Sequence, residues 1–398
     1  TPGFPFGRTR GATMDTPFSA PVSKLPNVGT TIFSVMTRLA VESGAINLAQ
    51  GFPDFQADPA LFSAALQAMQ SGANQYAPMA GVPALRSAIA AKVAACYGAA
   101  YDVEDEITVT AGATQALFTA IAAFVRPGDE VIVFAPVYDS YVPAIETVGG
   151  RAVPVALDFP DYAPDWAQVR ARITPRTRMI IVNSPHNPTG SVLSSADLDA
   201  LAALVHGTGI IVLSDEVYEH IVFDGARHTS VAAHPELAAR SVIVSSFGKT
   251  YHVTGWKIGY TLAPRTLMAE FRKVHQFNVF SVNTPGQRAL ADYMGDPARH
   301  EGLSAFYQQK RDFFRAQLSG ARFELLPCRG TYFQLARYDR ISSLPDREFA
   351  EWLTRSAGVA AIPVSAFHPD GRDDRVIRFC FAKQESTLAA AGERLRRL

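Results

Sequence analysis

The chain contains few cysteines and no excess of charge of either sign. Its three cysteines, Cys96, Cys328 and Cys380, are scattered and lack the spacing of metal ligands, which predicts reduced thiols, no disulfide framework and no metal site. Lysine and arginine (37 residues) balance aspartate and glutamate (37 residues), so neither nucleic acid nor an acidic membrane surface is an expected partner. We expect the partner to be a small molecule.

Long apolar runs and the glycine motifs of nucleotide-binding folds are also missing. No apolar stretch reaches the length of a transmembrane helix, and the opening residues lack the apolar core of a signal peptide. We therefore expect a cytoplasmic protein without membrane contact, with residues 1–20 as a flexible extension. The absence of GxGxxG and GxxxxGK[ST] motifs argues against a nicotinamide-dependent dehydrogenase.

Short apolar strands alternate with helix-like segments from residue 106 onward. Strands are expected at 107–109, 131–134, 179–182, 210–213 and 242–244. Near-continuous apolar strands separated by helices predict a mostly parallel sheet that helices cover on both faces. The expected fold class is therefore α/β, with a second, smaller α+β domain. We expect an irregular arm at 21–60 that contributes to the small domain, a large domain at 61–285 and a small domain at 286–398.

One lysine stands at an unusual place, directly after an apolar run. The segment 241–246 ends on serines, and Phe247 and Gly248 then lead to Lys249. An ammonium is costly to bury unless something neutralises or uses it. A lysine in partly apolar surroundings loses its proton more easily and forms Schiff bases with aldehydes such as pyridoxal phosphate. A solvated lysine at a strand end is the alternative.

Three other predicted strands also end in polar residues, and ligands of open α/β sheets collect at such carboxyl ends. The first leads to a helix start at 112–115 whose N–H groups suit an anion, although Thr114 could be an ordinary N-cap. The second runs into 183–190, a turn rich in asparagine and proline. The third delivers Asp215, which needs a partner such as a pyridinium nitrogen, an arginine or a helix N-terminus.

Together with Lys257, these groups match the functional groups of pyridoxal phosphate. At these positions the chain resembles the class I/II aminotransferases of fold type I, and within them the methionine and kynurenine aminotransferase (glutamine transaminase K) branch. The resemblance runs from about residue 23 to the C-terminus and rests on the blocks 47–55, 74–76, 183–190, 214–218, 245–257 and 377–381. It implies a ping-pong exchange of an amino group between an amino acid and a 2-oxo acid.

The resemblance also implies roles for residues around the cofactor ring. Lys249 would form the Schiff base and move a proton, and Asp215 would keep the ring nitrogen protonated. Asn187 and Tyr218 would hydrogen-bond the ring hydroxyl oxygen, and Tyr138 would stack on the ring. Either tyrosine could instead simply fill the core.

The cofactor phosphate would be bound, by the same resemblance, at a helix N-terminus. Tyr76 would reach it from the second subunit of a homodimer with shared active sites. The groups from the same chain would be those of Gly112, Ala113, Thr114, Ser246 and Lys257.

Arg378, in an otherwise apolar strand, is the expected anchor for the substrate. Its guanidinium suits bidentate binding of the α-carboxylate, with help from Asn187 and the Gly51 backbone, although an Arg–Asp pair is the alternative. Family pocket positions suit large neutral side chains such as those of Met, Phe, Tyr, Trp, Gln or kynurenine. Kynurenine enzymes carry Trp, Tyr and His at positions 33, 114 and 281, which favours methionine or broad aromatic specificity here. The pocket positions are Phe33, Tyr76, Thr114, Tyr138, Phe280, Ser281 and Tyr332.

Two alternative functions are compatible with the same fold and cofactor. A β-lyase acting on cysteine conjugates could use the same site, because the same cofactor chemistry can expel a good β-leaving group. A cofactor-binding regulator is the other alternative, since this fold also occurs fused to DNA-binding domains. The short N-terminal arm leaves no room for such a domain, and the balanced charge supplies no basic face.

Overall fold

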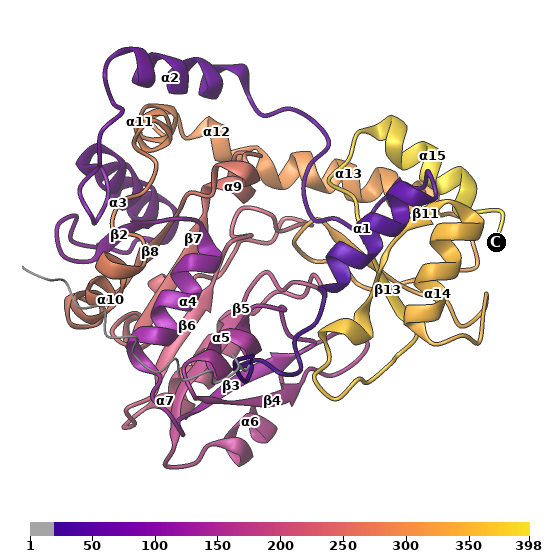
Figure 1. Cartoon of the computed structure of the whole chain (residues 1–398), viewed down its shortest axis with the longest axis horizontal. Coiled ribbons are helices and arrows are strands. Elements are labelled where there is room, and N and C mark those ends of the chain that lie inside the picture. Colours follow the sequence, from indigo (N-terminus) through magenta and orange to yellow (C-terminus); the bar gives the residue numbers. More distant parts are fainter. Residues whose placement is uncertain (1–19) are drawn as a thin grey trace, which may run out of the picture.

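A seven-stranded sheet organises the larger part of the chain (Figure 1). Within residues 20–398, which are those that the computed structural model describes, its strand order is β2-β8-β7-β6-β5-β3-β4. Neighbours among β3 to β7 pair in parallel, whereas β8 is antiparallel to both β2 and β7. The strands are β2 (Ile107–Thr110), β3 (Glu130–Ala135), β4 (Arg151–Ala156), β5 (Thr177–Asn183), β6 (Ile211–Asp215), β7 (Ser241–Ser246) and β8 (Gly259–Leu262).

Helices cover both faces of this sheet, because both faces of its central strands are apolar. In β5, Ile180 and Val182 belong to one core and Met179 and Ile181 to the other. The first core is completed by α3 (Pro83–Tyr97), α7 (Ser195–Val205) and α11 (Thr284–Tyr293), and the second by α4 (Ala113–Phe124), α5 (Tyr141–Thr147) and α10 (Arg265–Asn278). The predicted α/β class with a mostly parallel, two-sided sheet is confirmed.

A second, antiparallel sheet lies at the other end of the molecule, away from α2 and α3 (Figure 1). Its order within the described part of the chain is β12-β13-β10-β9, and β1 and β11 form a separate parallel pair. The strands are β1 (Ile46–Asn47), β9 (Glu324–Leu325), β10 (Phe333–Arg337), β11 (Val359–Ala360), β12 (Ile362–Pro363) and β13 (Val376–Cys380). The helices nearby are α1 (Ile32–Glu42), α13 (Leu303–Gln317), α14 (Asp346–Trp352) and α15 (Glu385–Leu395).

The prediction of an irregular arm at 21–60 is wrong for Ile32–Glu42, which form the regular helix α1. The Thr31 hydroxyl caps its first turn by accepting from the Ser34 N–H at 3.3 Å. Met36, Leu39 and Ala40, spaced for one helix face, are buried against the small sheet. The prediction overlooked this amphipathic pattern because glycine and proline residues flank the segment.

The structure adds further elements that the sequence does not predict. Strands β4 and β8 extend the large sheet, and three successive helices, α11, α12 (Ala298–Glu301) and α13, follow it along the chain. The remaining α-helices of the described residues are α2 (Pro59–Gln70), α6 (Trp166–Arg172), α8 (Pro235–Ala238) and α9 (Phe247–Thr250). The division at 60/61 and 285/286 stays a prediction, and residues 1–19 of the predicted extension lie outside the described residues.

The helices of the described residues carry no span suited to crossing a bilayer, since none is both long and apolar enough.

Candidate active site

A cavity of about 270 Å³ lies where the carboxyl ends of β5, β6 and β7 meet the N-terminus of α4. Large-sheet and small-sheet residues both line it, since β13 contributes Arg378 and β10 contributes Phe333, and the backbone of Gly51, after β1, lies at the same cavity. Most of the predicted site residues meet here: Phe33, Gly51, Gly112, Ala113, Thr114, Tyr138, Asn187, Asp215, Tyr218, Ser246, Lys249, Lys257 and Arg378. Polar residues at separate strand ends are therefore brought together as the parallel topology requires.

Lys249 lies on the single turn of α9 that follows β7, with its side chain at the cavity. Its Nζ donates to the Tyr332 hydroxyl at 3.0 Å and to the Gly51 carbonyl at 3.3 Å. Burial lowers the pKa of Lys249 to about 8, and the charges of Arg378 and Lys257 act in the same direction. At pH 7 about a tenth of this amine is therefore neutral and nucleophilic, far more than for a lysine in water.

Asp215 is the last residue of β6 and only 3% of its surface is exposed. Its Oδ2 accepts a hydrogen bond from the Tyr141 hydroxyl at 2.6 Å, and its Oδ1 accepts one from the Val217 N–H at 3.3 Å. Burial raises the pKa of Asp215 to about 6, against the effect of these two donors and of the Lys249 charge. A buried carboxylate of this kind stabilises a cation placed beside it.

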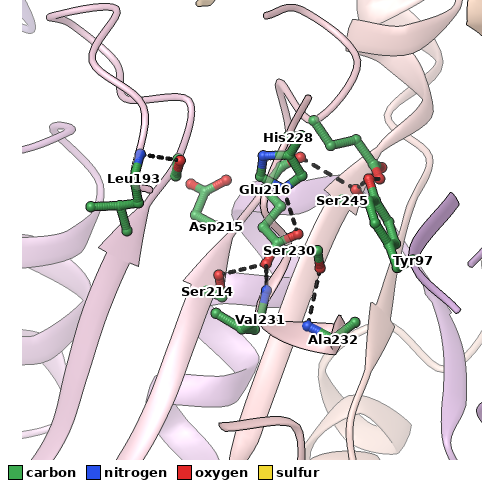
Figure 2. A network of polar contacts seen from close by, with 12 residues as sticks. Tyr97, Leu193, Ser214, Asp215, Glu216, His228, Ser230, Val231, Ala232 and Ser245 are labelled. Carbon is green, nitrogen blue, oxygen red and sulfur yellow. Dashed lines mark hydrogen bonds and ion pairs between the residues drawn. The ribbon is translucent and has the colours of Figure 1, made fainter. Parts of the chain in front are cut away.

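The residue after Asp215 is fixed by a separate polar network (Figure 2). Glu216 accepts hydrogen bonds from the Ser214 hydroxyl at 2.8 Å, the His228 ring at 2.8 Å and the Val231 N–H at 3.1 Å. These partners restrain the backbone directly after β6, and Asp215, the last residue of that strand, lines the cavity. The contacts of Glu216 thus restrain the chain segment that orients the Asp215 side chain.

The N-terminus of α4 offers groups suited to binding an anion. Gly112 caps the helix with φ +79°, and a Cβ there would lie 3.2 Å from Cε and 3.3 Å from Nζ of Lys257. The ammonium of Lys257 therefore lies beside the N–H groups of the first turn, which already favour negative charge. Thr114 and Ser246 add hydroxyls to the same part of the cavity. This arrangement fits a phosphate.

Arg378, in the middle of β13, is 1% exposed. Its guanidinium donates to Asn187 Oδ1 at 2.7 Å and to the Ala49 carbonyl at 3.2 Å, while its Nε has no hydrogen-bond partner. Three rings surround it, with centroids 3.9 to 5.3 Å from its Cζ: those of Phe333, Phe33 and Phe367. Among residues 20–398 it forms no ion pair, so the alternative of a structural Arg–Asp pair finds no partner. A buried cation with an unused donor at a cavity wall is a site for an anionic group.

Four predicted residues, Tyr332, Tyr76, Phe280 and Ser281, are placed outside the cavity lining, and the Ser281 hydroxyl donates to the Ala77 carbonyl at 3.0 Å. The sequence predicts Tyr332 as a wall of the substrate pocket, but its fully buried hydroxyl instead donates to the Gly51 carbonyl at 2.6 Å and accepts from Lys249. Tyr76 and Phe280 are 81% and 45% exposed and pack edge to face, with ring centroids 5.1 Å apart. A single chain thus leaves both rings at its surface.

Some residues at the site escape prediction from the sequence. Tyr141 is the first residue of α5 and stands three positions after Tyr138, and no pattern in the sequence marks it. Asp139 lines the cavity, and Asn183 both donates to the Asp215 carbonyl at 2.9 Å and accepts from the Asn187 N–H at 2.8 Å. Within the described residues, no cluster of three or more histidine, cysteine or acidic side chains is arranged to bind a metal ion.

Comparison with known proteins assigns this chain to a family. The family model "Aminotransferase class I and II" matches residues 43–395. The chain belongs to the class I and II aminotransferases and is a transaminase of that family.

Individual relatives cover nearly the whole chain. A methionine aminotransferase of Escherichia coli (strain K12) is 54% identical over 379 residues, covering 95% of this chain and 98% of the relative. A kynurenine–oxoglutarate transaminase 1 of Rattus norvegicus is 34% identical over 411 residues, covering 94% and 97%. A crystal structure from Escherichia coli, described as identifying a methionine aminotransferase function, has a TM-score of 0.94 at 54% identity and covers 96% of this chain and 100% of that one. These relatives favour the aminotransferase over the β-lyase alternative.

Proposed function

We propose that this aminotransferase transfers the amino group of methionine, of aromatic and of other large neutral amino acids to a 2-oxo acid, with pyridoxal 5′-phosphate as its cofactor. The observation that carries the proposal is a single cavity holding a lysine of lowered pKa, a buried carboxylate and a buried, ion-pair-free arginine: Lys249, Asp215 and Arg378. Glutamine and kynurenine are further candidate donors.

The donor set fits this cofactor group by group. When bound, pyridoxal phosphate supplies an aldehyde that condenses with amines and a ring that withdraws electrons from the attached carbon. Lys249 supplies the amine and can take and return a proton at the substrate α-carbon. Asp215 holds a proton on the ring nitrogen, and Tyr218 and Asn187 bind the ring hydroxyl oxygen. The N-terminus of α4, with Lys257 and Ser246, binds the phosphate.

The charges in the cavity support neutral side chains on the substrate. Among the described residues that line it, the cations are Lys249, Lys257 and Arg378, and each has a proposed role with the cofactor or the α-carboxylate. No lining cation is left for a carboxylate on the substrate side chain, and the Asp139 carboxylate would repel one. Phe33 and Tyr138 offer apolar surface instead. The names of the methionine and kynurenine relatives agree with this preference.

We also propose that the working form is a homodimer that shares its active sites. Helix α2 exposes Phe62, Leu66 and Met69, which follow one another at i, i+4 and i+7 and so form an apolar stripe. The surface also carries the exposed rings of Tyr76, Phe277 and Phe280. A second copy would cover these side chains and receive Tyr76 at its own phosphate site.

Purified protein loaded with pyridoxal phosphate tests the activity. We expect a visible cofactor absorbance, a borohydride-trapped adduct on Lys249 by mass spectrometry, and oxo acid formation from methionine and phenylalanine that requires an added 2-oxo acid. Lys249→Ala should abolish both adduct and transfer. Turnover without an acceptor and with thiol release would instead indicate a β-lyase, and absence of the adduct would overturn the cofactor assignment.

Hybrid dimers test the shared site. Lys249→Ala and Tyr76→Ala are each expected to be weakly active or inactive alone. In a mixed dimer one site would carry both defects and the other none, so mixing and re-equilibrating the two variants should restore up to about a quarter of wild-type activity by random pairing. No restoration despite demonstrated exchange of subunits would contradict a site built from both chains.

A further inference from the structure

Tyr141 is the direct hydrogen-bond partner of the carboxylate assigned to the cofactor ring. Its hydroxyl lies 2.6 Å from Asp215 Oδ2, and both side chains are buried, at 4% and 3% exposure. Tyr141 is the first residue of α5, and its ring packs edge to face on Tyr138 with centroids 5.5 Å apart. The hydroxyl therefore comes from a helix start that is held in place by the core.

The direction of this hydrogen bond is fixed by chemistry. Burial and the Asp215 charge raise the pKa of Tyr141 well above its ordinary value, so its hydroxyl stays protonated and can only donate to the carboxylate. The other carboxylate oxygen accepts from the Val217 N–H at 3.3 Å. With one donor on each oxygen, Asp215 is stabilised in its ionised form while its remaining lone pairs stay free.

We propose that Tyr141 is a positioning residue that keeps Asp215 ionised and aimed, so that Asp215 can hold a proton on the nitrogen of the cofactor ring. The inference rests on the proposed function, since it assigns Asp215 to that nitrogen. Without the hydroxyl, Asp215 would face the cavity with a single backbone donor. Its neutral form would be favoured, and its attraction for a pyridinium would fall.

The test uses a cofactor analogue that lacks the ring nitrogen. Cofactor-free wild-type protein and Tyr141→Phe are titrated with pyridoxal phosphate and with 1-deazapyridoxal phosphate, in which a CH group replaces the nitrogen. A hydrogen bond to a charged group makes a difference of about tenfold or more in affinity. We expect Tyr141→Phe to weaken binding of pyridoxal phosphate by roughly tenfold and to leave binding of the analogue within about twofold.

A matched control removes a buried tyrosine hydroxyl elsewhere. Tyr162 is 3% exposed, and its hydroxyl has no hydrogen-bond partner among the described residues. Tyr162→Phe should leave both affinities unchanged. A double-mutant cycle adds specificity: in the Asp215→Asn background, Tyr141→Phe should have no further effect on the preference for pyridoxal phosphate.

The pH dependence of cofactor affinity distinguishes this role from a purely structural one, because loss of a structural contact alone would not shift the pH profile. Asp215 is charged above its pKa, and loss of the Tyr141 donor raises that pKa, so the acid side of the affinity profile for pyridoxal phosphate should shift to higher pH in Tyr141→Phe. Replacing Tyr141 with 3-fluorotyrosine, whose phenol is a stronger donor of nearly the same size, should shift the profile to lower pH. This second variant keeps the test intact if Tyr141→Phe does not fold.

The outcomes separate this inference from the proposed function. Equal weakening of both cofactors, or no weakening of either, in Tyr141→Phe would overturn the role of Tyr141. If wild-type protein itself bound the two cofactors equally well, or bound neither, the assignment of Asp215 to the ring nitrogen would fail first. Preferential loss of pyridoxal phosphate with a shifted pH profile supports the inference.

Discussion

Lys92 and Glu219 form a buried ion pair behind the active site, with 2.6 Å between Nζ and Oε2 and side-chain exposures of 7% and 4%. Glu219 directly follows Tyr218, and its carboxylate also accepts from the hydroxyls of Tyr97, Ser245 and Tyr260. Burial is the largest single effect and raises the pKa of Glu219, but the Lys92 charge and the hydrogen bonds from Lys92 and Ser245 act together against it, so the pKa lies well below the ordinary value of a glutamate. Helix α3 is thereby tied to the loop that carries Tyr218.

Lys92→Met should therefore destabilise the protein strongly. It leaves Glu219 charged and buried without its cation, which typically costs about 3–5 kcal/mol of unfolding free energy. Urea unfolding of the two proteins measures the difference. The matched control is Lys273→Met, because Lys273 pairs with Glu270 at the surface, with exposures of 69% and 53%, and should change stability by less than about 1 kcal/mol. Equal effects at the two positions would contradict the importance of the buried pair.

Arg378→Lys should weaken binding of amino acids without weakening binding of the cofactor. Lysine keeps the positive charge but loses the planar fork that binds a carboxylate through two parallel hydrogen bonds. We expect KM for methionine to rise by roughly tenfold to a hundredfold, with a smaller change in kcat and an unchanged cofactor spectrum. Steady-state kinetics and absorbance titration measure these quantities. An unaltered KM would remove Arg378 from the substrate site.

The rate of covalent cofactor capture should follow the titration of Lys249. Its pKa of about 8 is lowered by burial, and only the neutral amine, present above that pKa, attacks an aldehyde. In cofactor-free protein the observed rate should rise about tenfold per pH unit below 8 and level off above it. Stopped-flow absorbance gives the rates, with free N-acetyl-lysine amide as the comparison, whose rate should keep rising to near pH 10. A protein rate that keeps rising in the same way would show that Lys249 has an ordinary pKa.

Asp139→Asn should broaden the substrate range toward acidic side chains. The change removes the carboxylate that lines the cavity beside Tyr138, whose repulsion of a substrate carboxylate we put at about 1 kcal/mol, or roughly fivefold. The ratio of kcat/KM for glutamate to that for methionine should rise by about that factor. If the ratio stays constant while activity on methionine is retained, Asp139 does not influence the choice of side chain.

Much of the fold follows from local patterns in the sequence. The central strands β3, β5, β6 and β7 are apolar on both faces, and their predicted positions agree with the structure to within a few residues. Edge strand β4 was missed because its residues alternate between exposed and buried and include an arginine and a proline. Strand β8 is short and begins with glycine, so its pairing between β2 and β7 depends on tertiary structure.

The residues of the site also fall into two groups, those that the sequence indicates and those that it does not. Polar residues that end apolar strands, such as Lys249 and Asp215, stand out in the sequence because burial makes them costly. Contacts between residues far apart do not: Tyr332 reaches Gly51 and Lys249, and Phe333 and Phe367 enclose Arg378. The hydroxyl of Tyr141 meets Asp215 across 74 positions. No local pattern specifies such pairs, because they depend on how the strands and helices pack.

The two ends of a bound amino acid would be held by different sheets. Arg378 belongs to β13 of the small sheet, whereas Lys249 follows β7 of the large one. A molecule with an amine and a carboxylate on the same carbon can bridge both halves of the enzyme at once. A decarboxylated amine of the same side chain would reach only one half, so the enzyme can discriminate amino acids from biogenic amines through the distance between its two halves rather than through the shape of the side-chain pocket.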